Sequence, residues 1–114
     1  MPDQGDVVLI PVPFTDLSSR KRRPVIVISC NAHNRTSRDM VVVAMTSNPQ
    51  TGAYCFTITT ADLAQGRLNH PGQVRVDKLY TLSQSLVVKR FGRVHASVLD
   101  RIRITLQDLV ASKP

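Results

Sequence analysis

Residues 18–29 read SSRKRRPVIVIS, in which four consecutive cations run directly into a proline and a β-branched segment. The run PVIVISC at 24–30 and the similar run MVVVAMT at 40–46 are almost continuous in apolar and β-branched residues. Segments of this kind are typical of strands in a barrel or sandwich core. Pro24 fixes its own φ and favours extended backbone at the preceding residue, so we expect Arg23 to enter the strand with little freedom.

Further strands are predicted on both sides of these two runs. They are DVVLIPV at 6–12, YCFTITT at 54–60, QVRVDKLYTL at 73–82 and SLVVKRFGRV at 85–94. Segments rich in turn-forming residues separate them. Residues 31–39 are expected to form such a turn segment, and the connection from 61 to 72 is expected to contain one helical turn at 61–64.

The C-terminal segment has a different period. Its apolar residues recur at helical spacing, at Val98, Leu99, Ile102, Leu106, Leu109 and Val110. Ser97 followed by Asp100 is similar to a capping box and predicts the helix start. We therefore expect a mainly β fold, a small and mostly antiparallel β-barrel closed by a C-terminal α-helix, in one domain spanning residues 1–114.

The composition restricts the class of partner. Fifteen Lys and Arg against eight Asp and Glu give a net charge of +7 and a pI near 10.3. This excess favours a polyanion such as RNA, DNA or an acidic protein segment, although it also serves solubility alone. No apolar run approaches the roughly 20 residues of a membrane span, and the N-terminus lacks the basic region of a signal peptide. We expect a cytoplasmic protein, with Cys30 and Cys55 as small buried residues.

The stretch QVRVDKL contains a candidate catalytic pair. Residues two apart on a strand share a face, so Arg75 and Asp77 are expected to project together while Val74 and Val76 face the opposite way. One interpretation is a surface ion pair of little energetic value. The other is a catalytic pair in which the carboxylate takes a proton and the guanidinium stabilises phosphoryl charge.

The cations before Pro24 also have two interpretations. They either protect a sheet edge or attract a polyanion, with Arg23 presenting its planar fork to a phosphate. At the end of the 40–46 run, the hydroxyls of Thr46 and Ser47 either bond a phosphate oxygen or cap their own turn. The residues that we expect to bind RNA without taking part in catalysis are Arg20, Lys21, Arg22, Ser47 and Lys78.

Metal and cofactor signals are weak. Cys30 and His33 have a C-x-x-H spacing, but no second pair completes a zinc site. His33, His70 and His95 are scattered and are interpreted as turn or surface residues, so no metal or other cofactor is expected. Aromatic residues are few, and we expect one base-stacking platform at most, drawn from Phe14, Tyr54, Phe56 and Tyr80.

Three blocks occur in an order that resembles the MazF/PemK family of type II toxin endoribonucleases. They are GDVVLIPVPFTDLSSRKRRPVIVIS, VVVAMTSN and GQVRVDKLYTL, and the resemblance covers about residues 5–110. It implies a small SH3-like β-barrel with a C-terminal helix. It also implies metal-independent cleavage of single-stranded RNA, usually mRNA, by a ribose 2′-hydroxyl, which leaves a 2′,3′-cyclic phosphate and a 5′-hydroxyl.

The resemblance also implies roles for single residues. Arg23 of the R-P step and Thr46 would grip the scissile phosphate, Asp77 would be the general base, and Arg75 would be the acid or the phosphate stabiliser. The high pKa of arginine favours the stabilising role. Some relatives carry a histidine in the loop before R-P, where this chain has residues 18–21 as Ser, Ser, Arg and Lys, so a cation is expected to supply that charge.

The expected partners are single-stranded RNA, a small acidic antitoxin that occupies the RNA groove, and a second copy of the chain in a homodimer. Two other functions remain open at this level. One is a toxin of the same fold that inhibits a protein such as a topoisomerase without cleaving RNA. The other is a nucleic-acid-binding module without chemistry.

Overall fold

The computed structural model describes residues 1–13, 21–49 and 52–114. Its strands are β1 (Asp6–Val12), β2 (Lys21–Val27), β3 (Asp39–Thr46), β4 (Cys55–Ile58), β5 (Leu63–Gln65), β6 (Gly72–Ser83) and β7 (Lys89–Val94). Its α-helices are α1 (Asn31–Thr36) and α2 (Ala96–Val110), with short 3-10 turns η1 (Thr60–Asp62) and η2 (Gln84–Leu86).

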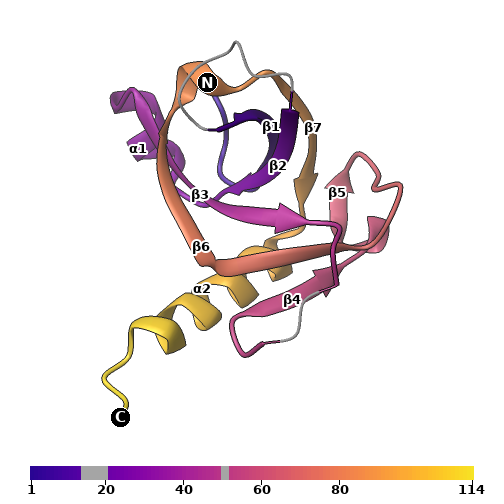
Figure 1. Cartoon of the computed structure of the whole chain (residues 1–114). Coiled ribbons are helices and arrows are strands. Elements are labelled where there is room, and N and C mark those ends of the chain that lie inside the picture. The colour runs from indigo at the N-terminus through magenta and orange to yellow at the C-terminus, as the bar shows by residue number, and fades with distance from the viewer. Residues whose placement is uncertain (14–20, 50–51) are drawn as a thin grey trace.

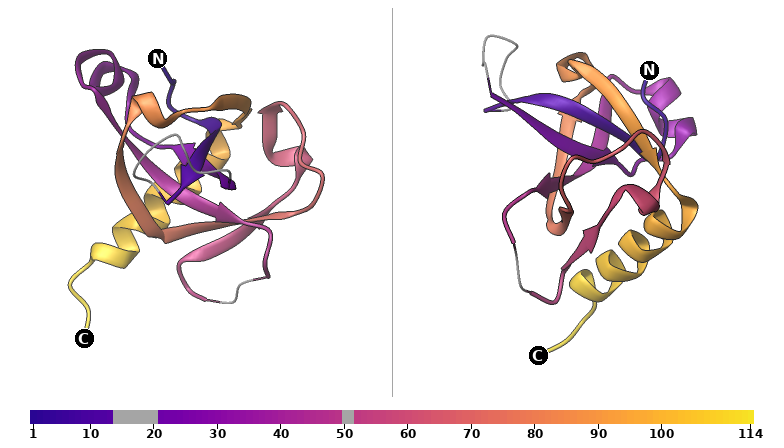
Figure 2. Two further views of the ribbon diagram at one scale, coloured as in Figure 1. Left: turned by 45° about the horizontal axis from the view of Figure 1, so that its top comes forward. Right: turned by 90° about the vertical axis from the view of Figure 1, so that its right-hand side faces the viewer.

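The strands form one antiparallel sheet in the order β4-β6-β3-β2-β1-β7-β5. The sheet curls strongly, so that β1, β2, β3, β6 and β7 surround a common interior (Figure 1). Helix α2 lies outside this curl, against one side of the sheet (Figure 2). The predicted mainly β fold with a C-terminal helix is confirmed.

The core consists of two clusters on opposite faces of the sheet, which explains the continuous apolar runs. On β3, Val42 belongs to the cluster inside the curl, whereas Val43 belongs to the cluster that includes Val98 and Ile102 of α2. Both valines are fully buried. A strand that is covered on both faces needs apolar residues at every position, so it lacks the alternation of apolar and polar residues that is typical of a half-exposed strand.

A sharp bend divides β6 into two halves. Val43 of β3 lies opposite Leu79, but the next residue, Ala44, lies opposite Arg75, so residues 76–78 have no partner on β3. The bend is visible where β6 turns from the lower part of the sheet to its rising part (Figure 1). The N–H of Val76 instead donates to the carbonyl of Tyr54 at 3.0 Å. This bend determines where the polar residues of β6 point.

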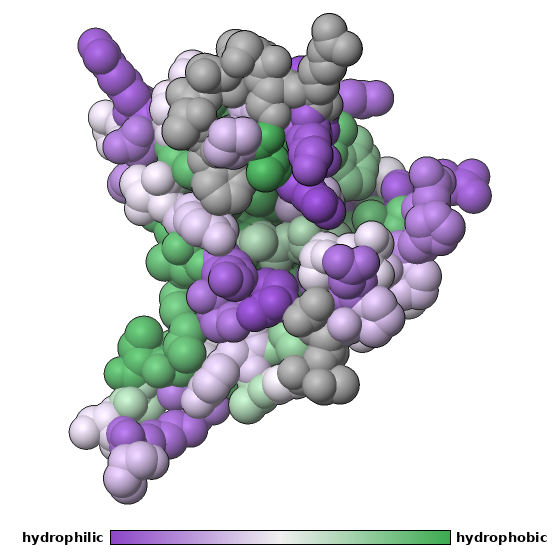
Figure 3. Space-filling view, in the orientation of Figure 1, coloured by the Kyte–Doolittle hydropathy of each residue, from purple (hydrophilic) through white to green (hydrophobic). Residues whose placement is uncertain are grey.

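Helix α2 differs from the prediction at both ends. It begins at Ala96 with His95 as N-cap and without a side-chain capping bond, so the predicted Ser97–Asp100 start is wrong. Val98 and Ile102 are buried and Leu99 and Leu106 pack on the same core, as the spacing predicted. Val110 is 72% exposed, because the helix extends past the sheet and leaves apolar side chains at the surface (Figures 1 and 3).

Several smaller expectations are also corrected. The strand predicted at 24–30 runs from Lys21 to Val27, because its cations pair with β1 and its pairing with β3 ends at Val27. Residues 31–36 form α1, whose buried Asn34 donates to the carbonyls of Pro2 and Ser29. The strand predicted at 85–94 begins at residue 89, and the predicted turn at 61–64 is η1 followed by β5. Cys30 is exposed and Cys55 half-buried, so neither is a buried core residue.

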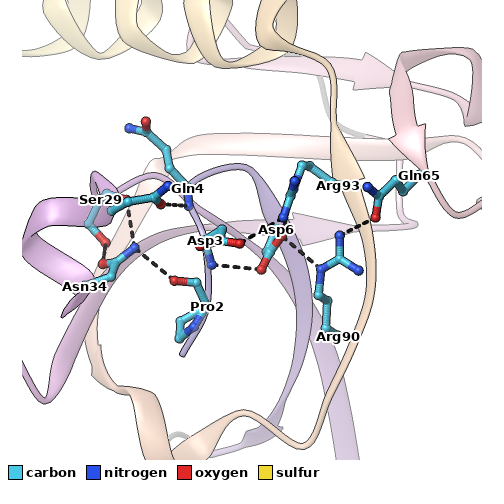
Figure 4. A network of polar contacts seen from close by, with 10 residues as sticks. Pro2, Asp3, Gln4, Asp6, Ser29, Asn34, Gln65, Arg90 and Arg93 are labelled. Carbon is cyan, nitrogen blue, oxygen red and sulfur yellow. Dashed lines mark hydrogen bonds and ion pairs between the residues drawn. The ribbon is translucent and has the colours of Figure 1, made fainter.

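A buried carboxylate fastens the N-terminal segment to β7. Asp6 is only 2% exposed, and its carboxylate accepts hydrogen bonds from Arg90 Nε at 2.9 Å, Arg93 Nε at 3.1 Å and the backbone N–H of Asp3 at 2.8 Å (Figure 4). A buried charge of this kind is stable only when its oxygens are occupied. Asp6, which follows Gly5 at the start of the first of the three family blocks, therefore has a structural role.

Candidate active site

A cleft of about 290 Å³ opens on the face of the sheet opposite α2. Its polar lining residues are Arg23, Thr46, Asn48, Arg75, Lys78 and Tyr80. Hydrophilic side chains gather over β6 in the middle of this face, next to a hollow (Figure 3). The cleft thus combines cationic and hydroxyl groups on one surface of the curled sheet.

Sheet register brings the predicted residues together. Val25 of β2 lies opposite Ala44 of β3, where the pairing of the two strands ends. Arg23 and Thr46 each lie two positions beyond this pair on their own strands, and both line the cleft. Ala44 also lies opposite Arg75 on its other side. Side chains two residues apart share a face, so three neighbouring strands direct these groups toward one cleft. The structure therefore brings Arg23, Thr46 and Arg75 to one cleft, and their joint catalytic role stays a prediction.

Arg75 and Asp77 form a two-point ion pair. Arg75 Nε donates to Asp77 Oδ1 at 2.9 Å, and Nη2 donates to Oδ2 at 2.7 Å. Val74 and Val76 are fully buried on the opposite face, as the alternation predicted. The hydrogen bond from Arg75 lowers the pKa of Asp77, and the same bond raises the pKa of Arg75. Arg75 lines the cleft, whereas Asp77 is not among the lining residues and reaches the cleft only through its ion pair with Arg75.

Thr46 caps its own turn, one of its two predicted roles, and it also lines the cleft. Its Oγ1 accepts the backbone N–H of Asn48 at 3.2 Å, which caps the turn that ends β3. The hydroxyl hydrogen of a threonine that accepts such a bond can still be donated. Because Thr46 also lines the cleft, its hydroxyl can donate to a phosphate oxygen placed there.

The structure describes four of the five residues predicted to bind RNA without taking part in catalysis. Lys78 lines it directly, and Ser47 lines a second depression beside it. Lys21 and Arg22 are exposed at the start of β2, where Arg22 Nη1 donates to the carbonyl of Lys21 at 3.2 Å. Arg20 lies outside the described residues.

Two polar residues of the cleft, Asn48 and Tyr80, are not assigned to the site from the sequence. Asn48 follows Thr46 by two positions, and Tyr80 follows Lys78 by two. This two-residue spacing from a predicted site residue is the signal in the sequence that could have identified them. Tyr80 was considered only as a stacking platform. Phe56 does not fit that role, because it is 6% exposed and the Arg101 guanidinium lies 4.1 Å from its ring centre. Phe14 is outside the described residues.

Within residues 1–13, 21–49 and 52–114, no three His, Cys, Asp or Glu side chains gather into a group that could hold a metal ion. The histidines at 33, 70 and 95 are all exposed, as predicted. None of the helices in the described part of the chain has the length and apolar character needed to cross a membrane.

The family model described as "PemK-like, MazF-like toxin of type II toxin-antitoxin system" matches residues 3–110. The chain belongs to this toxin family. The resemblance inferred from the three sequence blocks is therefore confirmed. No curated protein sequence matches this PemK/MazF-family chain.

Solved structures agree with the family assignment. An endoribonuclease in complex with its cognate antitoxin from a mycobacterial species is 23% identical, with a TM-score of 0.79 and coverage of 100% of both chains. A MazE-MazF complex from Deinococcus radiodurans is 26% identical, with a TM-score of 0.77 and coverage of 98% of both chains. MazF alone from the same organism is 25% identical, with a TM-score of 0.72 and coverage of 96% of both chains. The PemK/MazF fold thus spans this whole chain.

Proposed function

We propose that this chain is a toxin that cleaves single-stranded RNA in a sequence-selective, metal-independent reaction. The observation that carries the proposal is the convergence of Arg23, Thr46 and Arg75 from β2, β3 and β6 on one cleft. Similar solved structures described as endoribonucleases support the same activity. The net charge of +7 fits a polyanionic substrate.

In the proposed reaction, a ribose 2′-hydroxyl gives its proton to water as its oxygen attacks the adjacent phosphorus. The bond from phosphorus to the 5′-oxygen of the next nucleotide breaks, and that oxygen takes a proton from water. The products are a 2′,3′-cyclic phosphate and a 5′-hydroxyl. Arg23 and Arg75 stabilise the charge that grows on the phosphoryl oxygens, and the Thr46 hydroxyl donates to one of them. Two guanidinium groups supply the positive charge that such a transition state requires.

Asp77 is assigned a positioning role rather than the role of general base that the resemblance implied. Both of its oxygens accept from Arg75 in the structure. A lowered pKa also makes a carboxylate a weaker base. The geometry favours an Asp77 that holds the Arg75 guanidinium in a fixed plane, so that little rotamer entropy is lost when phosphate binds.

The proposed physiological partner is a small acidic antitoxin that covers the cleft, because complementary charge accelerates association. Solved complexes of similar chains with an antitoxin or with MazE support this partner. We also propose that the chain forms a homodimer in the cytoplasm. Light scattering after gel filtration, alone and with an acidic candidate antitoxin, measures both assemblies.

The decisive experiment is incubation of the purified protein with end-labelled single-stranded RNA in EDTA, beside single-stranded DNA of the same sequence. Discrete RNA fragments with cyclic phosphate ends and intact DNA are expected, because the DNA lacks the attacking 2′-hydroxyl. Growth arrest on expression without any RNA cleavage would refute the proposal and favour an inhibitor of a protein target such as a topoisomerase. RNA binding without cleavage or arrest would favour a binding module.

Variants separate the roles within the cleft. Arg23→Ala and Thr46→Val are each expected to lower kcat by roughly 10²–10³-fold, the usual effect of removing one transition-state donor. Arg35→Ala on α1 is the matched control, because this exposed arginine does not line the cleft. Full activity in Arg23→Ala would contradict the assigned site.

The positioning role of Asp77 is tested by a double-mutant cycle. If Asp77 acts only through Arg75, the double variant Arg75→Ala/Asp77→Asn has the same kcat as Arg75→Ala alone. The pH dependence of kcat/KM is measured in the same set, because loss of a general base removes one limb of the profile whereas loss of positioning lowers it uniformly. If the two substitutions lower kcat additively, and the pH profile of kcat/KM loses one limb in Asp77→Asn, then Asp77 is the general base.

A further inference from the structure

A second depression of about 360 Å³ adjoins the cleft. The two share a wall formed by Pro24, Met45 and Thr46. A group bound in the second depression would therefore lie next to a phosphate held by Thr46. Its volume, at about 360 Å³, falls at the lower end of the range for small-molecule sites.

The second depression has an apolar surface and a cationic, hydrogen-bonding rim. Its apolar lining includes Leu9, Leu68, Pro71 and Phe91. Its polar lining includes Arg67, Asn69, His70 and Lys89. The described residues that line it include no acidic side chain. We call this depression, defined by these eight residues, the Phe91 pocket.

The loop that carries most of the rim is held in place before any ligand arrives. The Oγ1 of Thr60 accepts the N–H of Leu68 at 2.9 Å and donates to the carbonyl of the same residue at 3.1 Å. The loop starts at Gly66, whose φ is +85° and where an added Cβ would lie 2.3 Å from the carbonyl oxygen of Phe91. Only glycine allows the loop and β7 to approach this closely. The pocket walls are therefore preorganised, which lowers the cost of binding.

We propose that the Phe91 pocket binds the base of a nucleotide next to the scissile phosphate and selects that base through Asn69 and His70. This assignment rests on the proposed ribonuclease activity. Sequence-specific RNA recognition places splayed-out bases on apolar or aromatic surfaces and reads their edges by hydrogen bonds. Asn69 and His70 each provide both a donor and an acceptor for such an edge. Arg67 and Lys89 supply positive charge for the phosphate of the same nucleotide.

The test uses a degenerate single-stranded RNA pool that is cleaved and then sequenced at the new 5′-hydroxyl ends. Wild type, Asn69→Ala and His70→Ala are compared for base preference at each position around the cut. Both side chains are exposed, and a thermal midpoint measured for each variant shows that it is folded. His33→Ala is the matched control, an exposed histidine on α1, on the far side of the curled sheet from β5 (Figure 1).

The expected result is loss of preference at one position beside the cut, with cyclic phosphate ends retained. The ratio of kcat/KM between the preferred RNA and the same RNA with that base changed should fall by roughly 5- to 150-fold, the discrimination of one good base contact. His33→Ala should keep the wild-type profile. An unchanged profile in both pocket variants, or an equal loss of rate on every sequence, would overturn the pocket assignment and leave the ribonuclease intact. Absence of RNA cleavage by wild type would overturn both.

Discussion

Removal of the buried Asp6 carboxylate is predicted to destabilise the whole fold. Asp6→Ala eliminates three hydrogen-bond acceptor contacts at once, two to the guanidinium groups of Arg90 and Arg93 and one to the backbone N–H of Asp3. The two arginine contacts join Asp6 to β7, across more than 80 positions of the chain. The ion pair between Arg93 Nη2 and Asp3 Oδ2 at 3.0 Å does not involve Asp6.

The size of this loss in the free energy of unfolding depends on the solvent exposure of the side chains that form the ion pairs. A hydrogen bond to a charged group contributes roughly 1.5–3 kcal/mol, and loss of one member of a fully buried ion pair costs about 3–5 kcal/mol. The Asp6 side chain is 3% exposed, but those of Arg90 and Arg93 are 39% and 34% exposed, so water can solvate them in the variant. The expected loss in the free energy of unfolding is therefore about 2–4 kcal/mol.

Urea unfolding followed by circular dichroism measures this loss. Asp100→Ala is the matched control, because Asp100 also pairs with an arginine, Arg103, at 2.6 Å, but with side chains that are 67% and 54% exposed. An exposed pair of this type contributes at most about 1 kcal/mol, and we expect a change within about 0.5 kcal/mol. Equal losses in the two variants would refute the reasoning that burial of the carboxylate determines its value.

Three further predictions concern the site and its supporting loop. In Arg75→Ala, the pKa of Asp77 should rise toward its ordinary value of 3.8, because the hydrogen bond that lowers it is gone; carbon NMR titration of the carboxyl measures this, and an unchanged pKa would contradict it. Since the pKa is lowered, the ion pair is intact above that ordinary value and is lost only as the pH falls through the lower one. Gly66→Ala should lower the free energy of unfolding by more than about 1 kcal/mol, through its positive φ and the clash with Phe91, and an unchanged urea midpoint would argue against it. Lys78→Ala should reduce the slope of log affinity for single-stranded RNA against log salt by about 0.7, as titrations by fluorescence anisotropy at several salt concentrations would show, whereas an unchanged slope would exclude a phosphate contact.

Part of the site could be predicted from the sequence because local periodicity determines which face a side chain occupies. The alternation around Arg75 places Val74 and Val76 in the core and the guanidinium on the open face, whatever the remaining topology. The helical spacing of Val98 and Ile102 likewise predicts the packed face of α2. The order of the three family blocks indicated the toxin family, which the family model confirms. The class of substrate, indicated by the charge and the resemblance, stays a prediction.

Other features depend on contacts between distant segments, which no local pattern contains. Residues 31–36 carry turn-forming side chains, but they form α1 because Asn34 is buried and bonded to Pro2 and Ser29. The three residues at 76–78 that have no partner on β3 mark the bend of β6, which the alternation of a straight strand does not predict.

The site itself shows the same division. Sequence alone determined that Arg23, Thr46 and Arg75 would lie on strands with their side chains exposed on one face or at a strand end. Tertiary structure decided that these strands are neighbours in a register that brings the three groups to one cleft. It also decided that the loop held by Thr60 borders the adjoining Phe91 pocket. The physical reason is that the direction of a side chain follows from the geometry of its own strand, whereas register and curl follow from pairing between segments far apart in the chain.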